Sequence, residues 1–178
     1  MTLEDLLRYE LSKRHTSEIA RMVDKNPALL HRLWEISLSD DEPVNWRAAW
    51  VLKGIREEEP VLVEPFLPQM RLALPKLKKD GVKREFLRIL LEYGVPDDEE
   101  ELGCMLSACF EWLANPAEPI AVKAHCMSVL LDISRQIPEI IPELQTTVEL
   151  AMAEGSAGII NRGSKVLKEL RKMQAETD

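Results

Sequence analysis

The sequence predicts an all-α fold, a right-handed α-α superhelix built as a short solenoid of stacked helix pairs. Two observations predict it. One helical pattern of apolar residues returns at a spacing of 37 to 40 residues, and the helices between those copies repeat at about twice that spacing. A unit of this length cannot bury its apolar face alone, so neighbouring units must stack to complete the core.

The recurring pattern has five apolar positions spaced i, i+4, i+7, i+8 and i+11, as on one face of an α-helix. Its four copies are Val44, Ala48, Val51, Leu52 and Ile55; Val82, Phe86, Ile89, Leu90 and Tyr93; Val122, Cys126, Val129, Leu130 and Ile133; and Ile159, Gly163, Val166, Leu167 and Leu170. Gly163 is the one weak position. We expect the four leucines at i+8 to be buried between layers.

The helices that precede these copies match one another at a double-length period. Two sets are related by a shift of 76 residues: Leu29, Leu30, Leu33, Trp34 and Leu38 become Met105, Leu106, Cys109, Phe110 and Ala114. Two others are related by a shift of 78: Leu62, Val63, Phe66, Met70, Ala73 and Leu74 become Ile140, Ile141, Leu144, Val148, Ala151 and Met152. Odd and even units therefore differ slightly.

In chain order, residues 1–25 are predicted to form an N-terminal helical cap. Its first helix runs from Leu3 to Leu11, and Thr16 or Ser17 caps the second. Four helix pairs follow at about 26–58, 61–94, 97–136 and 138–173, and a polar tail occupies 174–178.

Prolines and capping residues set the expected helix ends. Asn26 and Pro27 supply an N-cap and a proline at the first helical position, where its missing N–H costs nothing. Pro60 ends the first repeated helix near Glu57. Two further proline groups predict that 61–77 and the stretch beginning at 138 are kinked or two-piece elements; these are Pro65, Pro68 and Pro75, then Pro138 and Pro142.

The turn before the first repeated helix resembles the second-helix consensus of HEAT repeats, in which an acidic turn leads to Val-Arg, Ala-Ala, Ala-Leu-Gly and Ile. The matching run is Asp40 to Val44, followed by Ala48, Ala49, Leu52 and Ile55. It departs at Asn45, which replaces the usual Arg, at Val51, which replaces Ala, and at Gly54, one position late. Asp80 to Lys83 and Val122 to Lys123 echo the same turn. The resemblance covers about 27–173 and implies a fold, not an activity.

Five consecutive acidic residues, 97–101, look at first like a binding tract for a cation or a basic partner. They precede an apolar helix, however, and the positive end of a helix dipole favours acidic residues in its first turn. The alternating ligands and central glycine of a calcium loop are absent. We therefore interpret the tract as a helix start.

Composition limits the partners. A formal charge of −8 argues against general attraction to nucleic acid or anionic membranes, because phosphate binding needs a dense Lys and Arg footprint. No apolar run reaches the roughly 18 to 20 residues of a spanning helix, and the N-terminus lacks the basic leader and apolar core of a signal peptide. We expect a cytoplasmic protein without membrane attachment.

No constellation for catalysis, metal or cofactor binding is visible. Cys104, Cys109 and Cys126 form no C-x-x-C pair, and the three histidines have no partner at i+4. The segment 158–165 imitates the spacing of a phosphate-binding loop but has its lysine after the serine and no strand before it. We expect no cofactor, no metal and no enzymatic activity.

The positions opposite the buried stripe predict a binding face. Trp46, Trp50 and Lys53 lie on that side of their helix, and the equivalent positions carry Arg84, Arg88, Lys165 and Lys168. In arrays resembling HEAT and armadillo repeats this helix lines the concave surface. Trp and Arg are enriched at binding hot spots. The alternative is that both tryptophans pack against the capping helices or against a neighbouring unit of the array.

Two functions follow from this face. The first is an interaction or scaffold module that binds a peptide or acidic segment of another protein in its groove. The second resembles the HEAT-like DNA glycosylases for alkylated bases, which combine groove tryptophans and arginines with a catalytic aspartate. Trp50 stands where that resemblance requires the aspartate after Trp46, and the columns show no carboxylate beside Trp46. Nucleic acid is therefore the less favoured partner.

Overall fold

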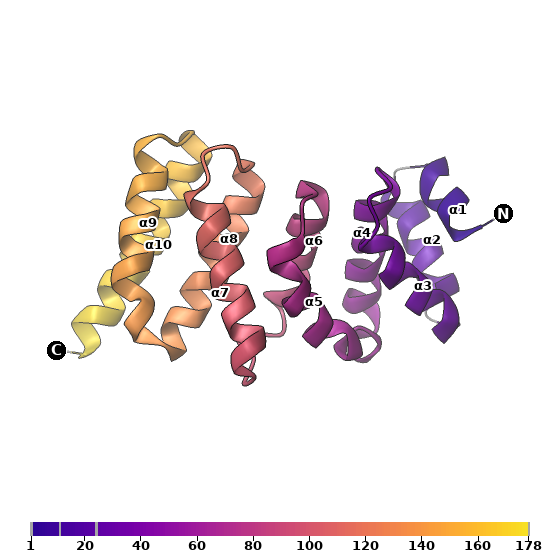
Figure 1. Cartoon of the computed structure of the whole chain (residues 1–178), viewed down its shortest axis with the longest axis horizontal. Helices are drawn as coiled ribbons and strands as arrows, with labels where there is room; N and C mark the ends of the chain where they lie inside the picture. Colours follow the sequence, from indigo (N-terminus) through magenta and orange to yellow (C-terminus); the bar gives the residue numbers. More distant parts are fainter. Residues whose placement is uncertain (1, 11, 24, 178) are drawn as a thin grey trace. The chain divides into compact units, whose positions relative to one another are not determined.

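A computed structural model describes residues 2–10, 12–23 and 25–177. Within these ranges the chain contains ten α-helices and four 3-10 turns, with no strand, so the predicted all-α class is confirmed (Figure 1). The chain divides into two compact units, Met1–Ile89 and Leu90–Asp178. The division into a cap, four helix pairs and a tail stays a prediction.

The first unit is built around α4, which packs against α1, α2 and α3. Its helices are α1 (Leu3–Tyr9), α2 (Lys13–Val23), α3 (Pro27–Ser37), α4 (Val44–Glu58), α5 (Leu67–Ala73) and α6 (Asp80–Leu90). The last residue of α6 already belongs to the second unit.

The second unit consists of helices that pack in pairs along the chain. They are α7 (Glu99–Ala114), α8 (Ile120–Gln136), α9 (Ile141–Ala153) and α10 (Ala157–Thr177). α7 packs against α8 and α9, and α10 packs against α8 and α9. Each helix therefore contributes its apolar stripe to one shared core.

The predicted apolar columns form the cores of both units. The four leucines at i+8 are buried, with exposed fractions of 0% for Leu52, Leu90 and Leu130 and 7% for Leu167. The other column positions are buried as well, except Tyr93, which is half-buried. The periodicity thus identified the buried face of every repeated helix.

Gly163, the weak column position, marks a close approach of α10 to α9. A Cβ atom built on Gly163 would collide with the side chain of Met152, whose Cγ would lie 2.6 Å away, and would lie 3.1 Å from Val148 Cγ1. The small residue therefore belongs to the core stripe, because the facing helix supplies the side chains that fill this position.

Prolines break the first of the two stretches predicted to be irregular. Residues 60–76 form three 3-10 turns around the short helix α5, as expected for a segment in which proline repeatedly removes a backbone donor. The second stretch also consists of two pieces, a 3-10 turn at Pro138–Ile140 and then α9, but α9 itself is a regular helix of 13 residues. Pro138 and Pro142 both lie in first turns, where the missing N–H has no intrahelical partner to lose.

The N-terminal helices begin where side chains cap them. Asn26 is the N-cap of α3, as predicted, and its Oδ1 accepts hydrogen bonds from the backbone N–H groups of Ala28 and Leu29 at 3.1 and 3.4 Å. The predicted cap of α2 at Thr16 or Ser17 is wrong. α2 begins at Lys13, and Ser12 Oγ accepts from the His15 N–H at 3.1 Å. Leu11, the predicted end of α1, lies outside the described residues.

The ends of the later helices follow the sequence signals. α4 ends at Glu58, before Pro60. α10 continues through Thr177, so the predicted polar residues 174–177 belong to this helix; Asp178 lies outside the described residues.

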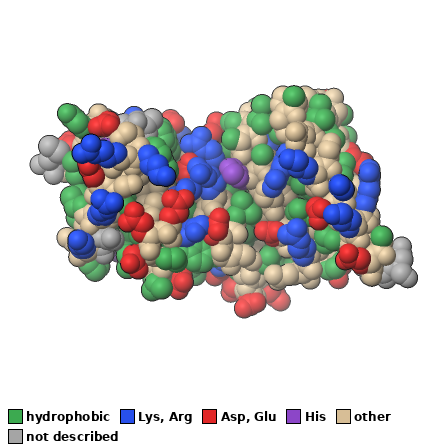
Figure 2. Space-filling view, turned by 180° about the vertical axis from the view of Figure 1, so that it is seen from behind, with side chains coloured by type: hydrophobic (Ala, Val, Ile, Leu, Met, Phe, Trp, Pro, Cys, Tyr) green, Lys and Arg blue, Asp and Glu red, His purple; other side chains and the backbone are tan. Residues whose placement is uncertain are grey.

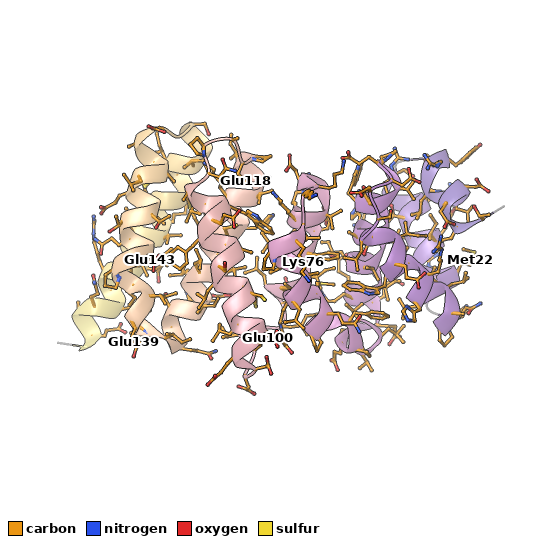
Figure 3. The ribbon with its side chains drawn as sticks, in the orientation of Figure 1. Met22, Lys76, Glu100, Glu118, Glu139 and Glu143 are labelled. Carbon is orange, nitrogen blue, oxygen red and sulfur yellow. The ribbon has the colours of Figure 1, made fainter. Side chains whose placement is uncertain are left out.

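The acidic tract starts α7, as predicted. Asp98 is the N-cap, and its Oδ1 accepts from the backbone N–H groups of Glu100 and Glu101 at 3.0 and 2.9 Å. Figure 3 shows Glu100 at this end of the helix. The carboxylates therefore stabilise a helix terminus.

Candidate binding groove

The first unit contains a groove between α2, α4 and α6 with a volume of about 490 Å³. Five of the seven predicted binding residues line it: Trp46, Trp50, Lys53, Arg84 and Arg88. Lys13, Thr16, Ser17, Gly54, Glu57 and Glu85 complete the lining. These five side chains therefore share one groove, as the helical spacing predicted.

The two tryptophans form the apolar wall of the groove. Trp46 and Trp50 are half-buried and stack with ring centroids 6.5 Å apart and planes inclined by 26°. Gly81 at the start of α6 packs directly on Trp46, because a Cβ atom on Gly81 would lie 2.6 Å from Trp46 Cβ. The position of the indole thus depends on a glycine in the facing helix.

Arg47 fixes the tryptophan wall to the N-terminal cap. Its guanidinium carbon lies 5.6 Å from the centroid of the Trp46 ring, within the range of a cation–π contact. Its NH1 group donates to the carbonyl oxygens of Leu7 and Arg8 at 2.8 and 3.1 Å, at the C-terminal end of α1. A cation at this end also complements the helix dipole.

Trp50 has a structural role as well as a groove-lining one. Its ring also borders a small cavity that is lined by Leu7, His15 and Ile19 of the two N-terminal helices. The alternative from the sequence, that the tryptophans pack against the cap, therefore holds in part for Trp50.

Arg84 and Arg88 are held by a carboxylate between them. Arg84 Nε donates to Glu85 Oε1 at 3.0 Å, and Arg88 NH1 lies 3.2 Å from both Glu85 oxygens. The Glu85 side chain is only 2% exposed, whereas those of the arginines are 39% and 37% exposed. Both guanidinium groups thus have one edge on a buried anion and another edge accessible from the groove.

Two carboxylates, Glu57 and Glu85, line the groove, although the predicted columns contained none. The predicted binding columns contain only positions opposite the buried stripe, and Glu85 lies at the edge between stripe and groove. The signal that could have identified it is the spacing of its partners, since Arg84 is adjacent and Arg88 follows at i+3, where helical side chains meet.

The charge of the groove is opposite to that of the whole chain. Lys53 forms an ion pair with Glu57, one turn along α4, and this hydrogen bond is the main reason why the pKa of Glu57 lies below its usual value. Glu57 is therefore ionised at neutral pH. Four basic side chains face two carboxylates, so the groove has an excess of two positive charges.

Gly54 keeps the floor of the groove open. It lies inside α4, and a Cβ atom there would meet no heavy atom within 4 Å. Glycine in a helix interior costs about 1 kcal/mol relative to alanine. A larger side chain at position 54 would meet no obstacle but would occupy part of the groove. Glycine at this position therefore keeps the groove concave.

Replacing Gly54 by alanine is expected to raise the free energy of unfolding by about 0.5–1 kcal/mol, because helix propensity improves without a collision. Chemical denaturation measures the change. Gly103→Ala is the matched control, since Gly103 also lies inside a helix with open space around it. A loss of stability in Gly54→Ala alone would contradict the open floor.

Lys165 and Lys168, the other two predicted binding residues, lie on α10 of the second unit, where both are exposed. The groove is built from the first unit alone. The hypothesis that these lysines share a binding face with the tryptophans stays a prediction.

The second unit has a separate hollow of about 400 Å³ that was not predicted from the sequence. It lies where α7 meets α8 and α9 meets α10, and it is bordered by the exposed side chains of Ile120 and Leu150. Figure 2 shows hydrophobic side chains at the upper end of the second unit, and basic and acidic side chains are interspersed over both units. The sequence shows that Ile120 and Leu150 are apolar, but it does not show that their side chains are exposed.

The described residues also bear on metal binding, cysteine reactivity and membrane insertion. They contain no group of three His, Cys, Asp or Glu side chains arranged to hold a metal ion. Cys109 and Cys126 are buried in the core columns, and Cys104 is half-buried. None of the helices within the described ranges has the length and apolar character needed to cross a membrane.

Comparison with known proteins identifies the family. A model of the HEAT repeat domain matches residues 3–170, which is nearly the whole chain. No match was found among curated proteins or among solved structures. The matched region includes the N-terminal helices as well as the repeated ones, and it agrees with the all-α fold and the recurring buried columns. The chain belongs to the HEAT-repeat family.

Proposed function

We propose that this protein is a non-enzymatic interaction module that binds an acidic, partly apolar segment of another protein in the groove between α2, α4 and α6. HEAT-repeat domains are typical of proteins that act through interaction surfaces. The proposed ligand follows from the groove itself, and the proposed location is the cytoplasm.

The observation that carries the proposal is the joint placement of an aromatic wall and two arginines around one concave space. Trp46 and Trp50 offer apolar area, and Arg84 and Arg88 offer charge-assisted hydrogen bonds to a carboxylate. The volume lies within the range of ligand-sized pockets, about 300–1,000 Å³. A short segment with acidic and apolar side chains satisfies both kinds of surface.

Local charge favours an acidic ligand even though the chain as a whole is acidic. The groove has an excess of two positive charges, while the net charge of the chain is −8. At physiological ionic strength the Debye length is about 8 Å, so a ligand in the groove responds mainly to the nearby basic residues. The distant negative charges slow the approach of a long polyanion more than that of a short peptide.

The test is a binding titration with three fluorescein-labelled hexapeptides of alternating sequence, Glu/Leu, Gln/Leu and Lys/Leu, followed by fluorescence anisotropy. The Glu/Leu peptide is expected to bind at least about tenfold more tightly than the Gln/Leu peptide, because two charge-assisted hydrogen bonds are lost with the carboxylates. The Lys/Leu peptide should bind most weakly. Equal affinity for all three would sink the proposal.

The presence of a groove carboxylate is the one observation that favours the second function, removal of alkylated bases from DNA. Glu85 lies among the residues that line the groove with Trp46 and Trp50. Its oxygens already accept hydrogen bonds from both arginines, however, and the carboxylate is 2% exposed. A catalytic carboxylate must approach the reacting atoms. Incubation with methylated DNA is expected to release no free base.

A further inference from the structure

We infer that Glu85 is a specificity-determining residue of the groove, which positions Arg84 and Arg88 for a single carboxylate and limits binding of polyanions. This inference rests on the proposed function, because it describes how the same groove selects its ligand. Glu85 was not among the residues expected to bind.

The geometry makes Glu85 the common partner of both arginines. One carboxylate oxygen accepts from Arg84 Nε at 3.0 Å and from Arg88 NH1 at 3.2 Å, and the second oxygen accepts from Arg88 NH1 at 3.2 Å. A guanidinium group has five N–H donors in a fixed plane. Anchoring one edge therefore orients the remaining donors of each arginine.

Burial makes this anchor persistent. The Glu85 side chain is 2% exposed, so its carboxylate has little water to replace the arginines as partners. A buried charge that loses its partners is strongly unfavourable, so the three side chains are expected to stay together when a ligand binds. Arg84 and Arg88 are thus fixed before the ligand arrives, which reduces the ordering cost of binding.

The charge of the triad limits what the groove attracts. The two arginines and Glu85 together carry one net positive charge instead of two. Binding of a nucleic-acid strand depends on the number of phosphates that basic side chains neutralise, and its salt dependence grows with that number. A lone carboxylate instead needs correctly placed donors, which the anchored arginines provide. Glu85 therefore favours the carboxylate over the polyanion.

The experiment compares Glu85→Gln with Glu57→Gln, two variants that each remove one negative charge from the groove lining. Only Glu85 contacts the two arginines; Glu57 pairs with Lys53. Affinities for the Glu/Leu hexapeptide and for a short oligo-dT strand are measured by fluorescence anisotropy at low and physiological salt. Circular dichroism and denaturation midpoints establish that each variant is folded.

In Glu85→Gln the ratio of oligo-dT affinity to peptide affinity is expected to rise about tenfold or more, because the added charge attracts phosphates while the arginines lose their orientation. In Glu57→Gln the rise should be about threefold or less. Glu85→Asp, which keeps the charge but shortens the side chain, should shift the ratio in the same direction as Glu85→Gln, and it serves as the test if the glutamine variant does not fold.

Equal changes in the two glutamine variants would overturn the inference, because net charge alone would then explain the selectivity. An unchanged ratio in Glu85→Gln and Glu85→Asp would overturn it as well, while peptide binding by the parent protein would leave the proposed function intact. Failure of the parent to bind the peptide would instead refute the proposed function, and the inference with it.

Discussion

Replacing Phe86 by alanine is expected to lower the free energy of unfolding by about 3–5 kcal/mol, the cost of deleting a buried aromatic ring and leaving a cavity. Phe86 is fully buried at the i+4 position of its column. It stacks on Trp34 of α3 with ring centroids 5.6 Å apart and planes inclined by 11°. The ring thus connects α6 to the preceding helix pair.

Urea denaturation followed by far-ultraviolet circular dichroism measures this loss. Val61→Ala is the control, because Val61 is 69% exposed and should change stability by less than about 0.5 kcal/mol. Similar midpoints for the two variants would show that the second copy of the apolar column does not form the core of its helix pair.

Replacing Arg84 and Arg88 together by glutamine is expected to lower the free energy of unfolding by about 2–4 kcal/mol, although both arginines are partly exposed. The cause is Glu85, whose buried carboxylate would lose both charged partners. Breaking a fully buried ion pair costs about 3–5 kcal/mol, and water entering from the arginine side should reduce that cost.

Adding Glu85→Gln to this double variant is expected to recover half or more of the lost stability, since the uncompensated charge disappears. Denaturation midpoints of the parent, the double variant and the triple variant give the comparison, and Arg14→Gln serves as the control because Arg14 pairs with Glu18 on the surface of α2. Absence of recovery in the triple variant would show that Glu85 is not the source of the loss. Charge reversal at both arginines is a poor test of binding, because it would place three carboxylates together.

Helical periodicity in the sequence was enough to predict the buried columns and the five groove residues of the first unit. Leu52 and Trp50 lie two positions apart on α4, and a rotation of 100° per residue places the first in the core and the second in the groove. A regular helix makes such assignments reliable because direction depends only on position number.

The features that were missed depend on contacts between helices. The burial of Glu85 could not be predicted without knowing which groups surround the edge of α6. A buried carboxylate is tolerated there because both arginines donate hydrogen bonds to it. The regular course of α9 depended on the register of Pro142 within the first turn, which a count of prolines does not give. Gly163 was a weak match to the apolar pattern because it has no side chain. The space beside it is filled by Met152, which lies on another helix.

The most direct test of the proposed groove is the affinity of the Glu/Leu hexapeptide for the parent protein, Gly54→Leu and Gly103→Leu. Leucine is a good helix former, and the open space at Gly54 lets its side chain extend into the groove without disturbing the core. We predict that Gly54→Leu binds about tenfold or more weakly than the parent, while Gly103→Leu, on α7, binds like the parent. Equal affinity for all three folded proteins would contradict the groove as the binding site.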